Sequence, residues 1–188
     1  MKKLFLFNIF VFFFITLFCF LGTWQLYRLQ WKQDLISQIN QGLKSNPIQY
    51  SQDIKKNYQK VTLVGKYHFE NQIYLYSLND KGQPGFDVVT HFETVNKENV
   101  LVNRGWIKKE LKNNLSINYA SNSIKGMLRQ ANRKNPFTPD NNIKENIWFS
   151  INLDDVQKTT GQKFNKFIVY LEDQNITAPK PKKITVDI

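Results

Sequence analysis

Apolar residues dominate the start of the chain. Residues 4–22 include no charged side chain, and the run is 19 residues long. At a rise of about 1.5 Å per residue, a helix of this length crosses about 28 Å, close to the thickness of a bilayer core. A buried helix of a soluble domain is the alternative, but phenylalanines on all its faces would need a larger protein to cover them. No small-residue cleavage site follows, so the pattern predicts an uncleaved transmembrane helix.

A different apolar pattern follows in residues 23–44. Leucine and isoleucine recur there at spacings of three, four and seven, with no proline before Pro47. This periodicity is typical of an amphipathic helix, so the transmembrane helix is expected to continue as a juxtamembrane helix. Residues 45–57 are polar and contain Pro47, which predicts a linker.

Beyond the linker the apolar period changes to two. Val61, Leu63 and Tyr67 alternate with polar residues, as in a half-buried strand. Residues 58–175 are therefore expected to form a mainly β, small α+β domain, for which a barrel-like closure is one arrangement. A basic tail is expected over 176–188. The expected elements are strands over 58–69, 73–78, 86–94, 99–107, 123–130 and 166–173, and a short helix over 153–161 that ends at Gly161.

The charge of the chain bears on its partners and its orientation. The net charge is +11, from 26 basic and 15 acidic residues, and the lysines are scattered and accompany no nucleic-acid motif. Anionic head groups or acidic partners are thus favoured over nucleic acid. Lys2 and Lys3 precede the apolar run and favour a cytoplasmic N-terminus, although Arg28 and Lys32 on the other side oppose this. The domain is expected on the outer side of the membrane.

Residues that could support catalysis or bind metal are few. Strand alternation predicts that His68 lies on an exposed polar face, and that His91 is a partly covered structural histidine. The adjacent Asp154 and Asp155 are expected to cap a helix. The single cysteine, Cys19, lies in the apolar run, and neither a nucleophile elbow nor metal-ligand spacing occurs. The sequence therefore predicts no enzyme and no metal site.

Four strings in order resemble the Surfeit locus protein one family of membrane-anchored cytochrome c oxidase assembly factors. They are "LGTWQLYRLQWKQDLI", "GQPGFDVVTHF", "VLVNRGWI" and "NPFTPDNNIKENIWFSINLDDV". The resemblance implies a domain on the outer side of the bacterial inner membrane or in the mitochondrial intermembrane space. It also implies partners among the oxidase subunits, above all the haem-bearing subunit, and a role in haem a insertion.

The resemblance also selects candidate residues for docking. Arg28 and Lys32 are four residues apart on one helical face, where they could contact haem propionates or acidic groups of a partner. Snorkelling toward lipid phosphates is the alternative. Arg104 and Trp106 are expected on one side of a strand, suited to a planar anion or to structural packing. The motif residues are Gly22, Trp24, Gln25, Arg28, Trp31, Lys32, Pro84, Gly85, Asn103, Arg104, Gly105, Trp106, Phe137, Pro139 and Trp148.

One part of the family pattern has no counterpart in these residues. The resemblance implies a second transmembrane helix with a haem-ligating histidine, and neither His68 nor His91 matches that position. These residues alone are therefore expected to bind haem a weakly or not at all. The leading interpretation is an assembly factor that supports haem a insertion. The alternative is an anchored interaction module that has lost haem binding.

Overall fold

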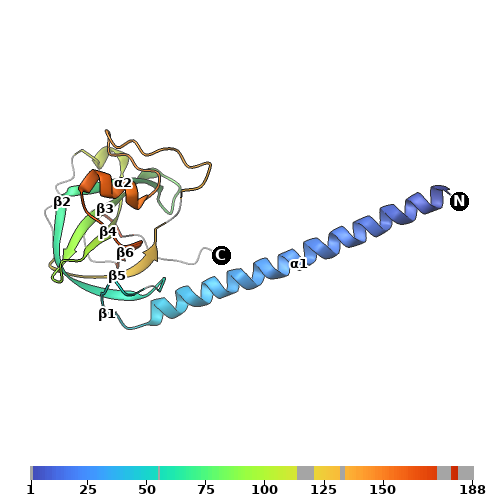
Figure 1. The fold of residues 1–188 in the computed structure, drawn as a ribbon, viewed down its shortest axis with the longest axis horizontal. Coiled ribbons are helices and arrows are strands. Elements are labelled where there is room, and N and C mark those ends of the chain that lie inside the picture. The colour runs from blue at the N-terminus through green and yellow to red at the C-terminus, as the bar shows by residue number, and fades with distance from the viewer. Residues whose placement is uncertain (1, 55, 114–120, 132–133, 173–178, 182–188) are drawn as a thin grey trace. The chain divides into compact units, whose positions relative to one another are not determined.

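The structure is a computed structural model, and it describes residues 2–54, 56–113, 121–131, 134–172 and 179–181. The chain divides into two compact units, residues 1–41 and 42–188. Helix α1, Lys2–Lys44, is one continuous helix (Figure 1), as predicted for the transmembrane and juxtamembrane segments. Of the helices that the structure describes, α1 is long and apolar enough to cross a membrane. Its end three residues before Pro47 agrees with the steric limit that proline sets.

The second unit is mainly β, as the alternating pattern predicts. The predicted linker 45–57 contains a two-residue strand, and the predicted basic tail 176–188 lies outside the described residues except for 179–181. The elements are β1 (Ile48–Gln49), β2 (Lys60–Leu78), β3 (Pro84–Thr94), β4 (Asn99–Lys108), the 3-10 helix η1 (Lys109–Leu111), β5 (Ser123–Gln130), α2 (Leu153–Thr160) and β6 (Phe167–Leu171).

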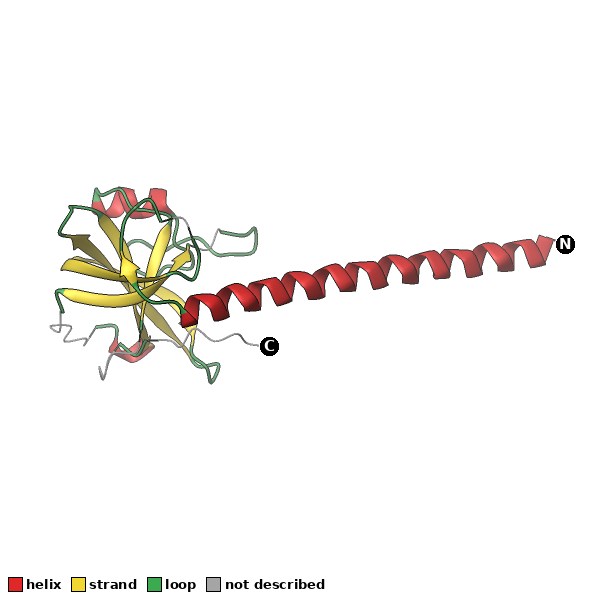
Figure 2. Cartoon of the chain, turned by 90° about the horizontal axis from the view of Figure 1, so that it is seen from below, coloured by secondary structure: helices red, strands yellow, loops and turns green. Residues whose placement is uncertain are grey.

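The strands form one sheet that closes into a ring (Figure 2). Their order is β1-β2-β3-β4-β6-β5, and a further pairing between β2 and β5 joins the two sides of the sheet. This closure depends on the length of β2. Its first residues, Lys60–Val64, pair with β5, and the remainder pairs with β3. Because β2 pairs with both β3 and β5, few strand edges of the sheet remain unpaired.

The prediction of two separate strands over 58–69 and 73–78 is wrong, because β2 runs through both. Four β2 residues, 69–72, lie between the pairs His68↔His91 and Ile73↔Val89, whereas β3 has one residue there. The polar residues 70–72 therefore form a bulge, which bends β2 without ending it.

Of the three apolar clusters among the described residues, the two larger ones lie on opposite faces of the sheet, and the third contains Phe86, Val88 and Ile107. The first contains Val61 and Leu63 of β2 with Phe92 of β3, and it fills the interior of the ring. The second lies on the outer face, where Leu101 of β4 packs with Val156 of α2 and with Trp148, which precedes α2. Alternation along each strand separates the two sets. The domain thus has a filled interior and one outer region covered by the segment that leads into α2.

Helix α2 confirms the predicted helix and its end at Gly161. Gly161 adopts a left-handed φ of 71°, and its backbone N–H donates to Gln157. The expected capping role of the two aspartates is wrong in detail. Asn152 is the N-cap and accepts a hydrogen bond from the Asp154 N–H, while Asp154 and Asp155 occupy the first turn, where their charge complements the helix dipole.

Candidate functional site

The motif residues of β4 form a β-bulge at Gly105. Asn103 pairs with Val89 and Trp106 pairs with Asp87, so β4 has one residue more than β3 between these pairs. Because cross-strand partners share a face, Trp106 lies on the face of Asn103 and not on that of Arg104. The expectation that Arg104 and Trp106 project to one side is therefore wrong. An isolated glycine in a strand pattern is a signal of such a bulge.

The bulge at Gly105 also receives a segment from the end of the chain. The Trp106 N–H donates to the Lys180 carbonyl at 2.7 Å, and the Lys180 N–H donates to the Trp106 carbonyl at 3.0 Å. A Cβ at Gly105 would lie 2.2 Å from the Lys180 oxygen, and Gly105 has a φ of 122°. Glycine is thus required here both by conformation and by the close backbone approach.

Trp106 is a packing residue. Its indole N–H donates to the Ser77 carbonyl at 3.3 Å. A Cβ at Gly85 would lie 2.5 Å from the Trp106 ring, so the indole rests directly on the backbone of β3. Gly85 and Trp106, which belong to two different motif strings, are therefore in contact. Pro84 opens β3 and is exposed.

Arg104 lies inside the domain, at 5 % exposure. Its guanidinium is 5.2 Å from the centroid of the Tyr67 ring and 5.1 Å from that of Phe69, in the range of cation–π contacts. Burial lowers the pKa of Arg104 from its ordinary value, and it raises the pKa of Tyr67 to about 12. This burial favours a structural role for Arg104 over direct contact with a partner.

Asn103 stabilises the same bulge from its own side chain. Its Oδ1 accepts a hydrogen bond from the Gly105 N–H at 2.9 Å, and its Nδ2 donates to Asp87 at 3.3 Å. Side chains that bond nearby backbone groups commonly stabilise such irregular conformations. In the string "NRGW", Gly105 thus forms the bulge, Asn103 and Trp106 make hydrogen bonds beside it, and Arg104 is buried on the opposite face.

Trp148 is buried as well, at 1 % exposure. Its indole N–H donates to Asn146 Oδ1 at 3.0 Å, and its backbone bonds to Tyr74 and Tyr76 of β2. Asn141 supports the same region, because its Oδ1 accepts from the N–H groups of Phe149 and Ser150. This part of the last motif string therefore anchors the segment before α2 to the sheet.

The two histidines are stacked, with ring centroids 4.6 Å apart and planes 18° from parallel. His91 is buried, with Nε2 at 2.9 Å from Asn99 Oδ1 and Nδ1 at 3.3 Å from Asn71 Nδ2. Burial lowers its pKa. A neutral ring with its proton on Nε2 satisfies both contacts, because Nδ1 then accepts. The prediction of a covered structural histidine is confirmed for His91.

His68 is not on an open face as predicted. Its side chain is 25 % exposed, and its Nδ1 and Nε2 lie 2.9 Å from Glu70 and 3.0 Å from Glu93. Both nitrogens donate when the ring is protonated, since carboxylates only accept. The stacked ring of His91 comes from the neighbouring strand, and alternation within β2 alone does not reveal it.

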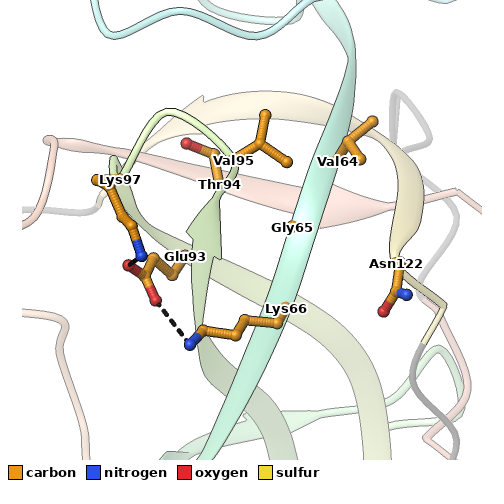
Figure 3. Close-up of a pocket in the computed structure, with 8 residues that line it drawn as sticks. All are labelled: Val64, Gly65, Lys66, Glu93, Thr94, Val95, Lys97 and Asn122. Atoms are coloured by element: carbon orange, nitrogen blue, oxygen red, sulfur yellow. Dashed lines mark ion pairs between the residues drawn. The ribbon is translucent and has the colours of Figure 1, made fainter.

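A cavity of about 400 Å³ lies beside Glu93 (Figure 3). Lys66 Nζ and Lys97 Nζ lie 3.3 Å and 3.1 Å from the Glu93 carboxylate, and Val64 and Val95 line another part of the cavity. Hydrogen bonds from His68, Lys97 and Lys66 lower the Glu93 pKa to about 2. The carboxylate thus stays ionised and links the two lysines to the histidine pair.

The juxtamembrane motif residues are all exposed on α1. Trp24, Arg28 and Trp31 fall within about 60° of one another around the helix, at about 100° per residue, and Lys32 lies beside them. The Arg28 guanidinium is 5.5 Å from the centroid of the Trp24 ring. We call these four residues the aromatic-basic stripe. Gly22 and Gln25 are exposed too; Gln25 lies about 20° from Lys32 around the helix, and Gly22 lies farther from the stripe.

A haem iron needs a strong axial ligand, and the two histidines are the first candidates for one. Among the described residues, no group of three or more His, Cys, Asp and Glu side chains could hold a metal ion. All four ring nitrogens of the two histidines already contact hydrogen-bonding side chains. In the part of the chain that the structure describes, both histidines are thus engaged by neighbouring side chains.

These features define a class of protein with a long apolar N-terminal helix and a ring-like β sheet, in which the buried motif residues stabilise the sheet and the others are exposed. The model of the SURF1 family matches residues 12–187, and the chain belongs to this family. A SURF1-like protein of Rickettsia conorii is 30% identical over 176 residues, covering 90% of this chain and 73% of that protein. Surfeit locus protein 1 of Gallus gallus is 32% identical over 171 residues, covering 78% of this chain and 55% of that protein.

A further relative extends the comparison. A SURF1-like protein of Rickettsia felis is 29% identical, with 90% of this chain and 77% of that protein covered. The similar proteins thus include bacterial and vertebrate ones. Family membership supports a role in cytochrome oxidase assembly in general, and it assigns the chain to assembly factors rather than to a known class of enzyme.

Proposed function

We propose that this protein docks on cytochrome c oxidase subunits, above all the haem-bearing subunit, and supports the insertion of haem a. The observation that carries the proposal is the aromatic-basic stripe on α1 in a chain of this family. Indole rings sit well at a membrane boundary, where one end is apolar and the other is hydrated. Arg28 beside such a ring can pair with a carboxylate at membrane level.

The described residues support docking better than they support iron ligation. Both histidines are committed to side-chain contacts, whereas the stripe presents two cations and two indoles at the surface. Haem a, when a subunit holds it, offers propionates that Arg28 and Lys32 can bind. Exposed ion pairs contribute only about 0 to 1 kcal/mol each, so the docking surface must extend beyond them.

The test is complementation of a strain that lacks the gene. The wild-type chain should restore haem a in membranes and oxidase activity, and the double variant Arg28→Ala, Lys32→Ala should restore less at an equal amount of protein. Lys44→Ala, an exposed change on the same helix, is the matched control. Full restoration by the double variant would show that these two cations only contact lipid.

A second candidate is an anchored interaction module without haem involvement, which the engaged histidines favour. Absorption spectra of oxidase subunits from the deletion strain separate the two. Subunits that lack haem a support the insertion role. Subunits that contain haem a but fail to assemble support the interaction module.

We further propose that the N-terminus is cytoplasmic and the β domain lies on the outer side of the inner membrane. Lys2 and Lys3 precede α1, and a long following domain is translocated largely regardless of its own charge. Alkaline phosphatase fused after residue 188 should be active, because it folds only outside the cytoplasm. A fusion to a reporter that works only in the cytoplasm should be inactive, and the reverse pattern would contradict this orientation.

A further inference from the structure

A tight turn at Asn135–Thr138 lies between β5 and α2. The Thr138 N–H donates to the Asn135 carbonyl at 3.0 Å, and Asn135 Oδ1 accepts from the Phe137 N–H at 3.0 Å and from the Thr138 hydroxyl at 2.9 Å. Asn at the first position and Pro136 at the second are the residues that such turns prefer. The fold therefore explains Asn135, Pro136 and Thr138.

Phe137 has no such explanation. Its side chain is 94 % exposed at the tip of the turn, and Pro136 and Pro139 beside it are also exposed. A phenylalanine in this position contributes almost no burial to folding, and any polar residue could follow proline in the turn. The tip thus presents three apolar residues to the surroundings.

The segment that carries the turn is fastened to the domain. Asn141, three residues after the turn, donates to the Ser150 carbonyl at 3.1 Å and accepts from the N–H groups of Phe149 and Ser150. The bonded pair Asn142 and Ile147 fixes the following loop. Figure 1 shows this segment running outside the sheet before α2. An aromatic ring on a preformed turn loses little conformational freedom on binding.

We infer that Phe137 is an anchor that inserts into an apolar pocket of a partner protein, and that this partner is an oxidase subunit. The identity of the partner rests on the proposed function. Single aromatic side chains in such pockets commonly dominate the free energy of an interface.

The charges around the tip favour a protein over a lipid surface. Residues 133–145 carry three basic and two acidic residues, a net charge of only +1, so their attraction for anionic head groups is weak. Lys134 is already paired with Asp140, whose side chain is 94 % exposed next to the tip. That ion pair lowers the pKa of Asp140, so its carboxylate stays charged and offsets the charge of Lys134.

The experiment places the photoreactive residue p-benzoylphenylalanine at position 137 of the full chain in its own membrane. Irradiation should form an adduct with an oxidase subunit, identified by mass spectrometry. The same residue at Ile143, in the same segment and 42 % exposed, is the matched control and should give much less of that adduct. An adduct with lipid alone, or equal adducts from both positions, would overturn the inference.

Substitution gives a second measurement. Phe137→Ala should leave the amount and the unfolding midpoint of the chain unchanged, while its association with the subunit weakens roughly 10- to 100-fold. Phe137→Leu, which keeps an apolar side chain, should restore most of it. If deleting the whole gene leaves the oxidase unchanged, the proposed function fails. If deletion lowers the oxidase and Phe137→Ala does not, only the inference about Phe137 is wrong.

Discussion

Replacing Gly105 by alanine tests how the β4 bulge and the segment at Lys180 are joined. The added Cβ would lie 2.2 Å from the Lys180 oxygen, a distance that real Cβ atoms do not reach. The φ of 122° is strained for alanine, which costs about 1 to 3 kcal/mol. Relief of the clash requires the segment to move, and this breaks two backbone hydrogen bonds worth about 0.5 to 1.5 kcal/mol each.

The expected loss of unfolding free energy is therefore roughly 2 to 6 kcal/mol, a large share of what such a domain has. Urea unfolding of the full chain in detergent, followed by tryptophan fluorescence, measures it. Amide hydrogen exchange at Trp106 and Lys180 reports the local change, because both N–H groups donate across the pairing. Both amides should lose protection in Gly105→Ala.

Gly82→Ala is the matched control. Gly82 also has a positive φ, 73°, but a Cβ there would meet no atom within 4 Å. This variant should lose only the conformational term, about 1 to 2 kcal/mol, and keep protection at Trp106. The reasoning is refuted if the two variants lose the same free energy and Gly105→Ala keeps both amides protected.

Two further substitutions test charged side chains of the β domain. Arg104→Lys keeps the charge but loses the planar group over two aromatic rings, so the free energy of unfolding in urea should fall by about 1 to 2 kcal/mol; an unchanged free energy would contradict the contact. Glu93 has its pKa lowered from 4.5 to about 2, so it stabilises the fold above pH 4.5, and this contribution is lost as the pH falls toward 2. Glu93→Gln should therefore have a lower urea midpoint than wild type at pH 7. Between pH 4.5 and 2 its midpoint should fall less than that of wild type. Midpoints of the two proteins that fall in parallel over this range would contradict the role of Glu93.

The elements that the sequence predicted well are those with a strong local pattern. The continuous helix α1 follows from an uncharged apolar run joined to a helical repeat, and β5 has the predicted bounds, 123–130. Gly161 ends α2 where a glycine after a polar helix is expected. In each case the residues that determine the element are neighbours in the chain.

The features that were missed depend on contacts between distant residues. The bulge in β2 looked like a break between two strands, because nothing local shows that β3 continues to pair beside it. The stacking of His68 on His91 joins two strands in the same way. The pairing of Lys180 with Trp106 brings together residues far apart in sequence. Register between strands is set by the whole sheet and its turns, so a single strand pattern does not reveal it.

Burial separates the motif residues into two groups with different physical roles. Gly85, Arg104, Trp106 and Trp148 are buried and held by named contacts, so substitution there removes folded protein. The aromatic-basic stripe and Phe137 are exposed and stabilise almost nothing within the described residues. If both groups serve oxidase assembly, their variants must differ in one ratio, the oxidase activity per molecule of this chain in the membrane. Buried variants should lower the amount of chain and keep that ratio, whereas exposed variants should keep the amount and lower the ratio.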